Sequence, residues 1–209
     1  VIDVPKIHFS AGPGPEIILN SPHQNSTCRP NALINFSISD PDGIDTVVQK
    51  WTGEQNQTFY WPYDTNVPTI AGKQEIQITA NDTLGNTRSK NFTFWVDTSP
   101  PVVNLLSPAN NSIYESGLVV QFAIQDNYDL SPNNACWYNW DGGKNISLSE
   151  PFNVTIPYGN GEKLLNFFAN DSVSYVKHVT FNVTVEDPDS KGPTIILLNP
   201  HNNTTGRSE

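Results

Sequence analysis

The sequence predicts an all-β fold made of antiparallel β-sandwiches arranged in tandem and joined end to end. Three observations lead to this prediction. The chain repeats itself about every 90 residues, apolar residues alternate with polar ones inside each repeat, and no segment has the spacing of an amphipathic helix. With 209 residues, the chain has room for two ordinary domains.

The repeat is visible at both ends of each unit. Three similar proline-flanked segments mark its start, at 15–22, 101–108 and 193–200. The end is marked by Ala80-Asn81-Asp82-Thr83, which corresponds to Ala169-Asn170-Asp171-Ser172. We therefore expect one sandwich at 15–99 and a second at 100–190, with the end of a preceding repeat or a linker at 1–14 and the start of a third repeat at 191–209. Proline-rich, semi-rigid joints are expected at 97–101 and 187–193.

Inside each unit, apolar residues recur at every second position, which is the signal of a β-strand. Ile34, Phe36 and Ile38 share one face of such a segment, and polar residues occupy the other. The same alternation recurs at 76–80, 92–96, 120–124, 152–156, 165–169 and 181–185. Alternation that makes only one face apolar indicates antiparallel sheets with one side in water, and hence a sandwich.

The composition excludes several classes of protein. A net charge of −10 argues against a nucleic-acid surface, because no basic patch could displace phosphate counterions. No apolar run approaches the roughly 18 residues of a membrane helix, so we expect no membrane segment in this chain. The sequence contains no Met, not even an initiating one, and we expect it to be a segment of a longer protein.

Several short motifs resemble those of one known group of proteins. They are Asp-Thr-x-Pro-Pro at 97–101, Leu-Ser-Pro-Ala-Asn-Asn-Ser at 106–112, Trp-Tyr-x-Trp-Asp-Gly-Gly at 137–143 and the repeated Ala-Asn-Asp-[Ser/Thr]. Together they resemble the Ig-like repeats of large archaeal and some bacterial extracellular cell-surface proteins. The resemblance covers almost the whole chain, although the first unit lacks the Trp-Tyr…Asp-Gly-Gly form. It implies Ig-like or fibronectin-III-like sandwiches, an extracellular location, and a role as a stalk, an adhesin or a surface-layer subunit.

Two functions are consistent with these features. The first is a non-enzymatic structural module of a glycosylated surface layer, filament or stalk, which acts by rigid spacing and lateral self-association. The alternative is an adhesin or a carbohydrate-binding accessory module of a larger secreted protein. No catalytic residues are predicted, because the four histidines are scattered and neither HExxH nor GxSxG occurs.

N-glycosylation is the strongest chemical signal in the sequence. The chain has twelve Asn-x-Ser/Thr sequons, whereas its Asn, Ser and Thr content predicts about 4 by chance. They lie at Asn25, Asn35, Asn56, Asn81, Asn91, Asn110, Asn145, Asn153, Asn170, Asn182, Asn202 and Asn203. We expect N-linked glycans first at Asn35, Asn91, Asn153 and Asn182, which have the outward phase of their strands. Asn81 and Asn170 have a second explanation in turn chemistry, and only one of the overlapping pair Asn202 and Asn203 is expected to be used.

Clustered aspartates suggest calcium as the one inorganic cofactor to consider. The candidate ligands in turns and joints are Asp40, Asp42, Asp45, Asp97, Asp126 and Asp129. Calcium takes six to eight oxygen ligands, which such loops can supply. The competing interpretation is that Asp-Pro-Asp-Gly is ordinary turn chemistry. No EF-hand spacing is present, so both interpretations stay open at this point.

Two aromatic residues have the outward phase of their strands, Trp95 and Phe168. We expect them to make lateral contacts, with a sister chain, a neighbouring domain or a glycan. Trp51 and Trp140 are instead expected in the core, as sandwiches commonly bury an aromatic residue on the third strand.

The two cysteines, Cys28 and Cys136, occupy different positions in their repeats. Sandwich topology places both near the joint between the two units, so we expect them to form a disulfide outside the cell. The alternative is two isolated thiols, buried or capped.

Overall fold

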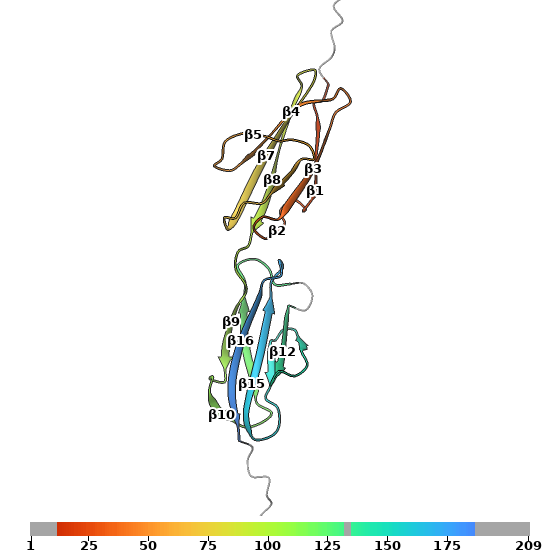
Figure 1. Ribbon diagram of the computed structural model, residues 1–209. Helices are drawn as coiled ribbons and strands as arrows, with labels where there is room; N and C mark the ends of the chain where they lie inside the picture. Colours follow the sequence, from red (N-terminus) through yellow and green to blue (C-terminus); the bar gives the residue numbers. More distant parts are fainter. Residues whose placement is uncertain (1–11, 132–134, 187–209) are drawn as a thin grey trace, which may run out of the picture. The chain divides into compact units, whose positions relative to one another are not determined.

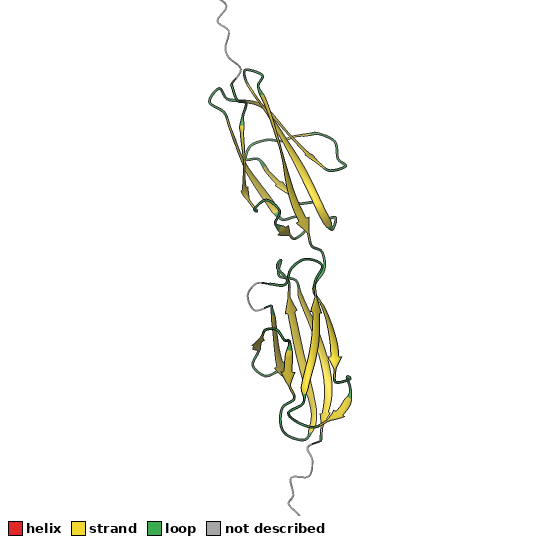
Figure 2. Ribbon diagram, turned by 180° about the vertical axis from the view of Figure 1, so that it is seen from behind, coloured by secondary structure: helices red, strands yellow, loops and turns green. Residues whose placement is uncertain are grey.

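The computed structural model describes residues 12–131 and 135–186. This part of the chain consists of strands and loops, and it contains no helix (Figures 1 and 2). Accordingly, the described residues include no helix long and apolar enough to cross a bilayer. Residues 1–11, the joint expected at 187–193, the third repeat expected at 191–209 and the sequons at Asn202 and Asn203 lie outside the described residues.

Eight strands between residues 16 and 96 form two sheets. The strands are β1 (Glu16–Ser21), β2 (Thr27–Cys28), β3 (Leu33–Ser39), β4 (Ile44–Trp51), β5 (Gln57–Thr58), β6 (Asp64–Asn66), β7 (Gly72–Asp82) and β8 (Thr87–Val96). One sheet has the order β1-β3-β6 and the other the order β2-β8-β7-β4-β5. Neighbouring strands are antiparallel. The exception is the short edge strand β2, which runs parallel to β8 with Thr27 opposite Trp95.

The next eight strands repeat this order. They are β9 (Val102–Ser107), β10 (Ser112–Tyr114), β11 (Val119–Gln125), β12 (Cys136–Trp140), β13 (Ile146–Leu148), β14 (Asn153–Thr155), β15 (Gly161–Asn170) and β16 (Val176–Val185). Their sheets have the orders β14-β11-β9 and β10-β16-β15-β12-β13, and β10 again runs parallel to β16. This strand order is that of an Ig-like sandwich. The predicted fold class, all-β with tandem Ig-like sandwiches, is confirmed.

The alternating apolar residues form the core, as their spacing predicts. On β3, Ile34 and Phe36 are buried, while the alternating residues Asn35 and Ser37 are not. Facing side chains from the other sheet complete this core, among them Ile76, Ile78, Phe92, Phe94 and Trp51. Phe94 and Ile76 are fully buried. Burial of one such side chain contributes about 1.5–3 kcal/mol to folding, so the period-two pattern is what fixes which face of each strand turns inward.

The chain separates into two compact units, each of which contains more than one segment. Among the described residues, the first unit contains 12–102 together with the segments 124–131, 135 and 168–177. The loop that follows β11 and the loop that joins β15 to β16 therefore belong to the first unit. The second contains 103–123, 136–167 and 178–186. The domain boundaries drawn from the sequence repeat stay a prediction.

The structure does not contain the expected disulfide, because Cys28 and Cys136 are both free. Cys28 lies on β2 and packs in the core formed by β1–β8, and Cys136 on β12 is fully buried. Burial raises the pKa of the Cys28 thiol, and it raises that of Cys136 to about 12. The expectation placed Cys28 in a connection and Cys136 at the start of a strand, with both near one joint. In the structure each is a strand residue whose side chain turns inward, one in each compact unit.

Candidate cation sites and glycosylation surface

Two clusters of three aspartates lie at the ends of strands. The first cluster contains Asp40, Asp42 and Asp82, and the second contains Asp97, Asp126 and Asp171. In each cluster, one carboxylate oxygen from every member lies within 4.8 Å of the others. Four of the six aspartates predicted as calcium ligands are therefore brought together, two in each cluster. Asp45 and Asp129 belong to neither cluster.

Two members of each cluster occupy corresponding places in the two repeats, whereas the third members, Asp42 and Asp97, do not. Asp40 directly follows β3, and Asp126 directly follows the corresponding strand β11. Asp82 ends β7, and Asp171 directly follows the corresponding strand β15. Asp82 and Asp171 were not predicted as ligands, because the Ala-Asn-Asp-[Ser/Thr] motif was interpreted through its asparagine. The repetition of an aspartate beside that asparagine was the signal that could have found them.

In the first cluster, hydrogen bonds within the protein satisfy the buried carboxylate. The Oδ1 atom of Asp82 accepts from the backbone N–H groups of Leu84 and Asn86, at 2.9 and 2.8 Å. Its Oδ2 atom accepts from Nδ2 of Asn86 at 2.7 Å. Desolvation opposes ionisation of Asp82, but these hydrogen bonds prevail and the pKa of its carboxyl is lowered.

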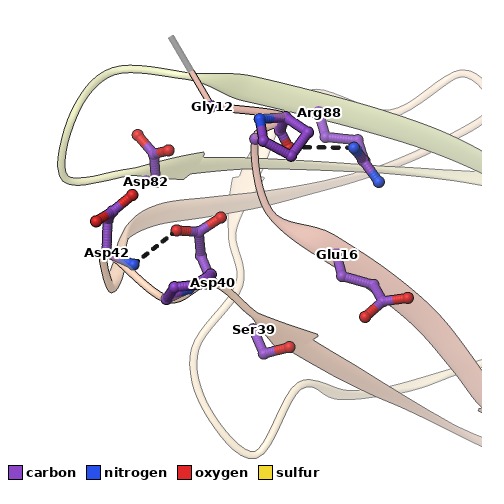
Figure 3. Close-up of a pocket in the computed structure, with 10 residues that line it drawn as sticks. Gly12, Glu16, Ser39, Asp40, Asp42, Asp82 and Arg88 are labelled. Carbon is purple, nitrogen blue, oxygen red and sulfur yellow. Dashed lines mark hydrogen bonds between the residues drawn. The ribbon is translucent and has the colours of Figure 1, made fainter. Parts of the chain in front are cut away.

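The other two aspartates of the first cluster shape a turn. The backbone N–H of Asp42 donates to Oδ1 of Asp40 at 2.9 Å, and Gly43 closes the turn with a positive φ of 89°. The cluster lines one side of an open groove of about 620 Å³. In Figure 3 the three aspartates lie near one another, whereas Arg88 lies apart from them and donates to the Pro13 carbonyl at 3.1 Å.

In the second cluster, each aspartate binds its own turn through Oδ1. The Oδ1 atoms of Asp97, Asp126 and Asp171 accept from the backbone N–H two residues ahead, at 3.1, 3.0 and 2.9 Å. Asp171 Oδ1 also accepts from the N–H of Tyr175 at 2.8 Å. All three Oδ2 atoms are buried and have no hydrogen-bond partner in the described structure. The side chains of Asp97 and Asp171 are fully buried.

The second cluster therefore concentrates negative charge without compensation. Desolvation raises the pKa of Asp126, and the nearby carboxylates of Asp97 and Asp129 raise it further against one opposing hydrogen bond from Tyr128. Desolvation also raises the pKa of Asp171, with further contributions from Asp97 and Asp126. Burying an unpaired carboxylate is costly, so this cluster requires either protons or a cation.

The predicted glycosylation sites are distributed over the surface of both repeats. Ten of the twelve sequon asparagines lie in the described residues, and none of these ten is buried. Seven are exposed: Asn25, Asn56, Asn91, Asn110, Asn145, Asn153 and Asn182. Three are half-buried: Asn35, Asn81 and Asn170. Among the preferred sites, Asn35 alone is half-buried, and its Nδ2 donates to Oδ1 of Asp64 beside it on β6. The Nδ2 of the exposed Asn91 donates to Oε1 of Glu75 at 3.2 Å.

The outward aromatic residues are placed differently from one another. Trp95 is 38% exposed, and its ring lies against that of Tyr128 with 6.0 Å between the ring centroids. Phe168 is half-buried. A stronger feature is the pair Tyr60 and Trp61 between β5 and β6, whose side chains are 76% and 82% exposed. This pair was not predicted to make a contact, because Tyr60 and Trp61 follow β5 and lie outside any segment of alternating apolar residues.

No protein-family model and no curated protein matches this sequence. Solved structures of tandem β-sandwich modules are similar to it. The fibronectin(III)-like modules of Clostridium thermocellum CbhA share 14% identity at a TM-score of 0.45, over 87% of this chain and all of theirs. The N-terminal eight Ig domains of Down syndrome cell adhesion molecule share 10% sequence identity with it at a TM-score of 0.44. The match covers 85% of this chain and 30% of theirs. The tandem Ig repeats of Dlar share 14% sequence identity with it at a TM-score of 0.31. The match covers 84% of this chain and 99% of theirs. Similarity at this level says nothing about activity. The fold assignment above rests on the strand order and not on these matches.

Proposed function

We propose that this chain is a non-enzymatic structural module of a glycosylated extracellular surface protein, such as a surface layer, filament or stalk. In this role it acts by rigid spacing and by lateral self-association between copies. One observation carries the proposal: all ten described sequon asparagines lie at the surface, although several are on strands whose alternate residues are buried.

The physical argument concerns where a glycan can be attached. A branched, hydrated sugar cannot enter a packed core, so a used sequon must place its asparagine outward. Asn153 on β14 lies next to the buried Val154, and Asn182 on β16 lies next to the buried Val183. A shift of one residue in either strand would bury these asparagines. Their exposure supports extracellular processing and a function at the cell surface.

The direct test is the mass of the chain isolated from an N-glycosylating host. We expect an intact mass above that of the bare 23.1 kDa chain, with glycopeptides at three or more sequons, including Asn153 and Asn182. Substitution of Ser or Thr at the third sequon position, as in Thr155→Ala and Thr184→Ala, should remove the corresponding glycopeptides one at a time. A bare-chain mass from native material would contradict the proposal.

The exposed pair Tyr60 and Trp61 favours a second candidate, a carbohydrate-binding or adhesive module. Flat, exposed aromatic rings are suited to stacking on sugar faces. This candidate predicts that polysaccharide retards the protein in affinity electrophoresis and that Trp61→Ala abolishes the retardation. Tyr158→Ala serves as the matched control, since Tyr158 is also 82% exposed but has no aromatic neighbour in the chain. Equal mobility of wild type with and without polysaccharide would exclude it for the sugars tested.

A further inference from the structure

We propose that Asp97, Asp126 and Asp171 form a calcium-binding site. All three belong to the first compact unit, and they come from three separate segments of it. Asp97 directly follows β8, Asp126 begins the loop after β11, and Asp171 begins the loop between β15 and β16. The site does not depend on the proposed surface function, because it rests on the side chains of this unit alone.

The strongest support comes from three oxygen atoms that lack partners. The Oδ2 atoms of Asp97, Asp126 and Asp171 are all buried without a hydrogen-bond donor. Asp97 and Asp171 have fully buried side chains, so solvent does not hydrate them from outside. Buried polar atoms in folded proteins are almost always satisfied, and three unsatisfied carboxylate oxygens at one place indicate a missing positive partner.

The first repeat provides an internal comparison. Asp82 and Asp171 correspond, and both accept backbone N–H groups from the residues two and four positions ahead. The residue four positions ahead is Asn86 in the first repeat, and its side chain also caps Asp82 Oδ2 at 2.7 Å. In the second repeat this residue is Tyr175, which has no amide to offer. The sequence thus supplies a neutral donor to one aspartate and leaves the corresponding oxygen of the other available to a ligand.

Arg29, which contacts the loop that begins at Asp171, is already engaged elsewhere. Arg29 donates from Nε to the Val173 carbonyl at 2.5 Å, and its guanidinium carbon lies 4.3 Å from the centroid of the Tyr175 ring. It does not hydrogen-bond to any of the three Oδ2 atoms. Asp129 adds a fourth negative charge close enough to raise the pKa of Asp126. No described donor therefore reaches these three oxygens, and a cation from solution can supply the charge.

Ligand chemistry favours calcium, and the spacing allows a single ion to contact all three oxygens. The three ligands are carboxylate oxygens, which suit hard cations, and neither cluster includes a histidine or cysteine. Oxygens on opposite sides of one calcium ion stand at most about 4.8 Å apart, since each bond is about 2.4 Å long. The oxygens in this cluster lie within 4.8 Å of one another. Magnesium keeps several waters and is usually held by one or two carboxylates, whereas this cluster offers three.

The binding test uses the full chain produced without glycans and stripped with EDTA. Titration calorimetry should show one calcium ion bound per chain, and saturating calcium should raise the melting temperature by about 5 °C or more. Terbium, which substitutes for calcium, should luminesce when Trp95 and Tyr128 are excited, because Tyr128 lies beside Asp126. Calcium should displace it. The absence of both calcium heat and terbium emission would overturn the proposal, and so would magnesium binding as tightly as calcium.

Matched variants then locate the site. Asp126→Asn and Asp171→Asn keep the side-chain shape and should each weaken calcium affinity by about tenfold or more, because each removes a charged ligand. Asp42→Asn in the first cluster is the control and should leave affinity unchanged. Loss of binding in Asp42→Asn with retention in the other two would place the ion at the first cluster and refute this assignment. Far-UV circular dichroism confirms folding, and a variant that fails this check is replaced by Asp97→Asn, for which the same loss is expected.

Discussion

Asn86 caps Asp82 twice, with its backbone N–H 2.8 Å from Oδ1 and its side-chain Nδ2 2.7 Å from Oδ2. This pairing holds the loop between β7 and β8 closed and keeps the Asp82 pKa low. At the corresponding place of the second repeat, Tyr175 offers only its backbone N–H to Asp171. One side-chain difference between otherwise similar turns therefore separates a self-satisfied aspartate from one that needs an external partner.

Removal of the Asn86 side chain should destabilise the first repeat. In Asn86→Ala the buried Oδ2 of Asp82 loses its only side-chain donor, and we expect the melting temperature to fall by a few degrees. Thermal unfolding followed by circular dichroism at pH 7 measures the shift. Asn20→Ala is the control, since its side-chain contacts to Asn35 and Ser37 are exposed. Equal shifts in the two variants would show that the cap contributes nothing specific.

The two clusters should respond to pH in opposite directions when calcium is removed. The pKa of Asp82 is lowered in the folded state, so its contribution to stability is present above the ordinary value of 3.8 and is lost as pH falls through the lowered pKa. The pKa values of Asp126 and Asp171 are raised, so the folded state binds more protons than the unfolded state above 3.8. Stability from these two groups should therefore increase as pH falls from 7 toward that value.

Melting temperatures measured from pH 7 to pH 4.5 in EDTA test this expectation. The wild type should melt at higher temperature as pH falls, and Asp126→Asn/Asp171→Asn should lose most of that dependence. Millimolar calcium should flatten or reverse the wild-type slope, because the bound ion keeps the carboxylates charged. An identical slope in wild type and the double variant would show that other groups dominate this range.

Both cysteines should behave as protected thiols. Cys28 is 5% exposed and Cys136 is fully buried, so a thiol reagent should label neither quickly in the native protein at pH 8. Denaturation without reductant should release two reactive thiols per chain. Detection of none after denaturation would mean that the chain forms a disulfide in solution, contrary to the structure.

Core packing should dominate stability over the exposed aromatic residues. Phe94 is fully buried, and its ring centroid lies 6.4 Å from that of Trp51. Phe94→Ala should cost about 3–5 kcal/mol of unfolding free energy. Trp61→Ala removes a larger side chain that is 82% exposed, and it should change stability by less than about 0.5 kcal/mol. Urea unfolding of both variants gives the comparison, and a large cost for Trp61→Ala would reveal packing against Trp61.

Lateral self-association should depend on the exposed aromatic residues. In sedimentation at increasing protein concentration, we expect the wild type to show larger species and Tyr60→Ser/Trp61→Ser to show fewer of them. Trp95→Ser tests the contact predicted from strand phase, although Trp95 also packs against Tyr128. Sedimentation of the wild type as a monomer at all concentrations would remove self-association from the proposed function.

The sequence predicted features that depend on local periodicity. Ile34, Phe36 and the other alternating residues lie inward because a strand exposes its two faces in turn, and this property is readable from one segment. Asp97 and Asp126 were recognised as candidate ligands from their density in turns. Asp171 was not, because the motif was interpreted through its asparagine and because its approach to Asp97 and Asp126 joins segments far apart in the sequence.

The cysteines show the same boundary between local and long-range information. β2 has only two residues, so it leaves no alternation from which the inward phase of Cys28 could be read. The repeat pattern places Cys28 near a joint but does not show which way its side chain points. The burial of Cys28 follows from the pairing of β2 with β8, which joins residues far apart in the sequence.

The half-buried asparagines Asn35 and Asn81 constrain the order of events during synthesis. Asn35 sits in β3 between β1 and β6, and its amide donates to Asp64, while the amide of Asn81 donates to Thr46 at 3.1 Å. The sugar is attached to the side-chain amide nitrogen, and in both residues that nitrogen is already engaged in a hydrogen bond. Attachment after folding must break this contact, whereas attachment before the sheet closes does not. The fraction of molecules modified at these asparagines therefore compares the rate of glycosylation with the rate of folding.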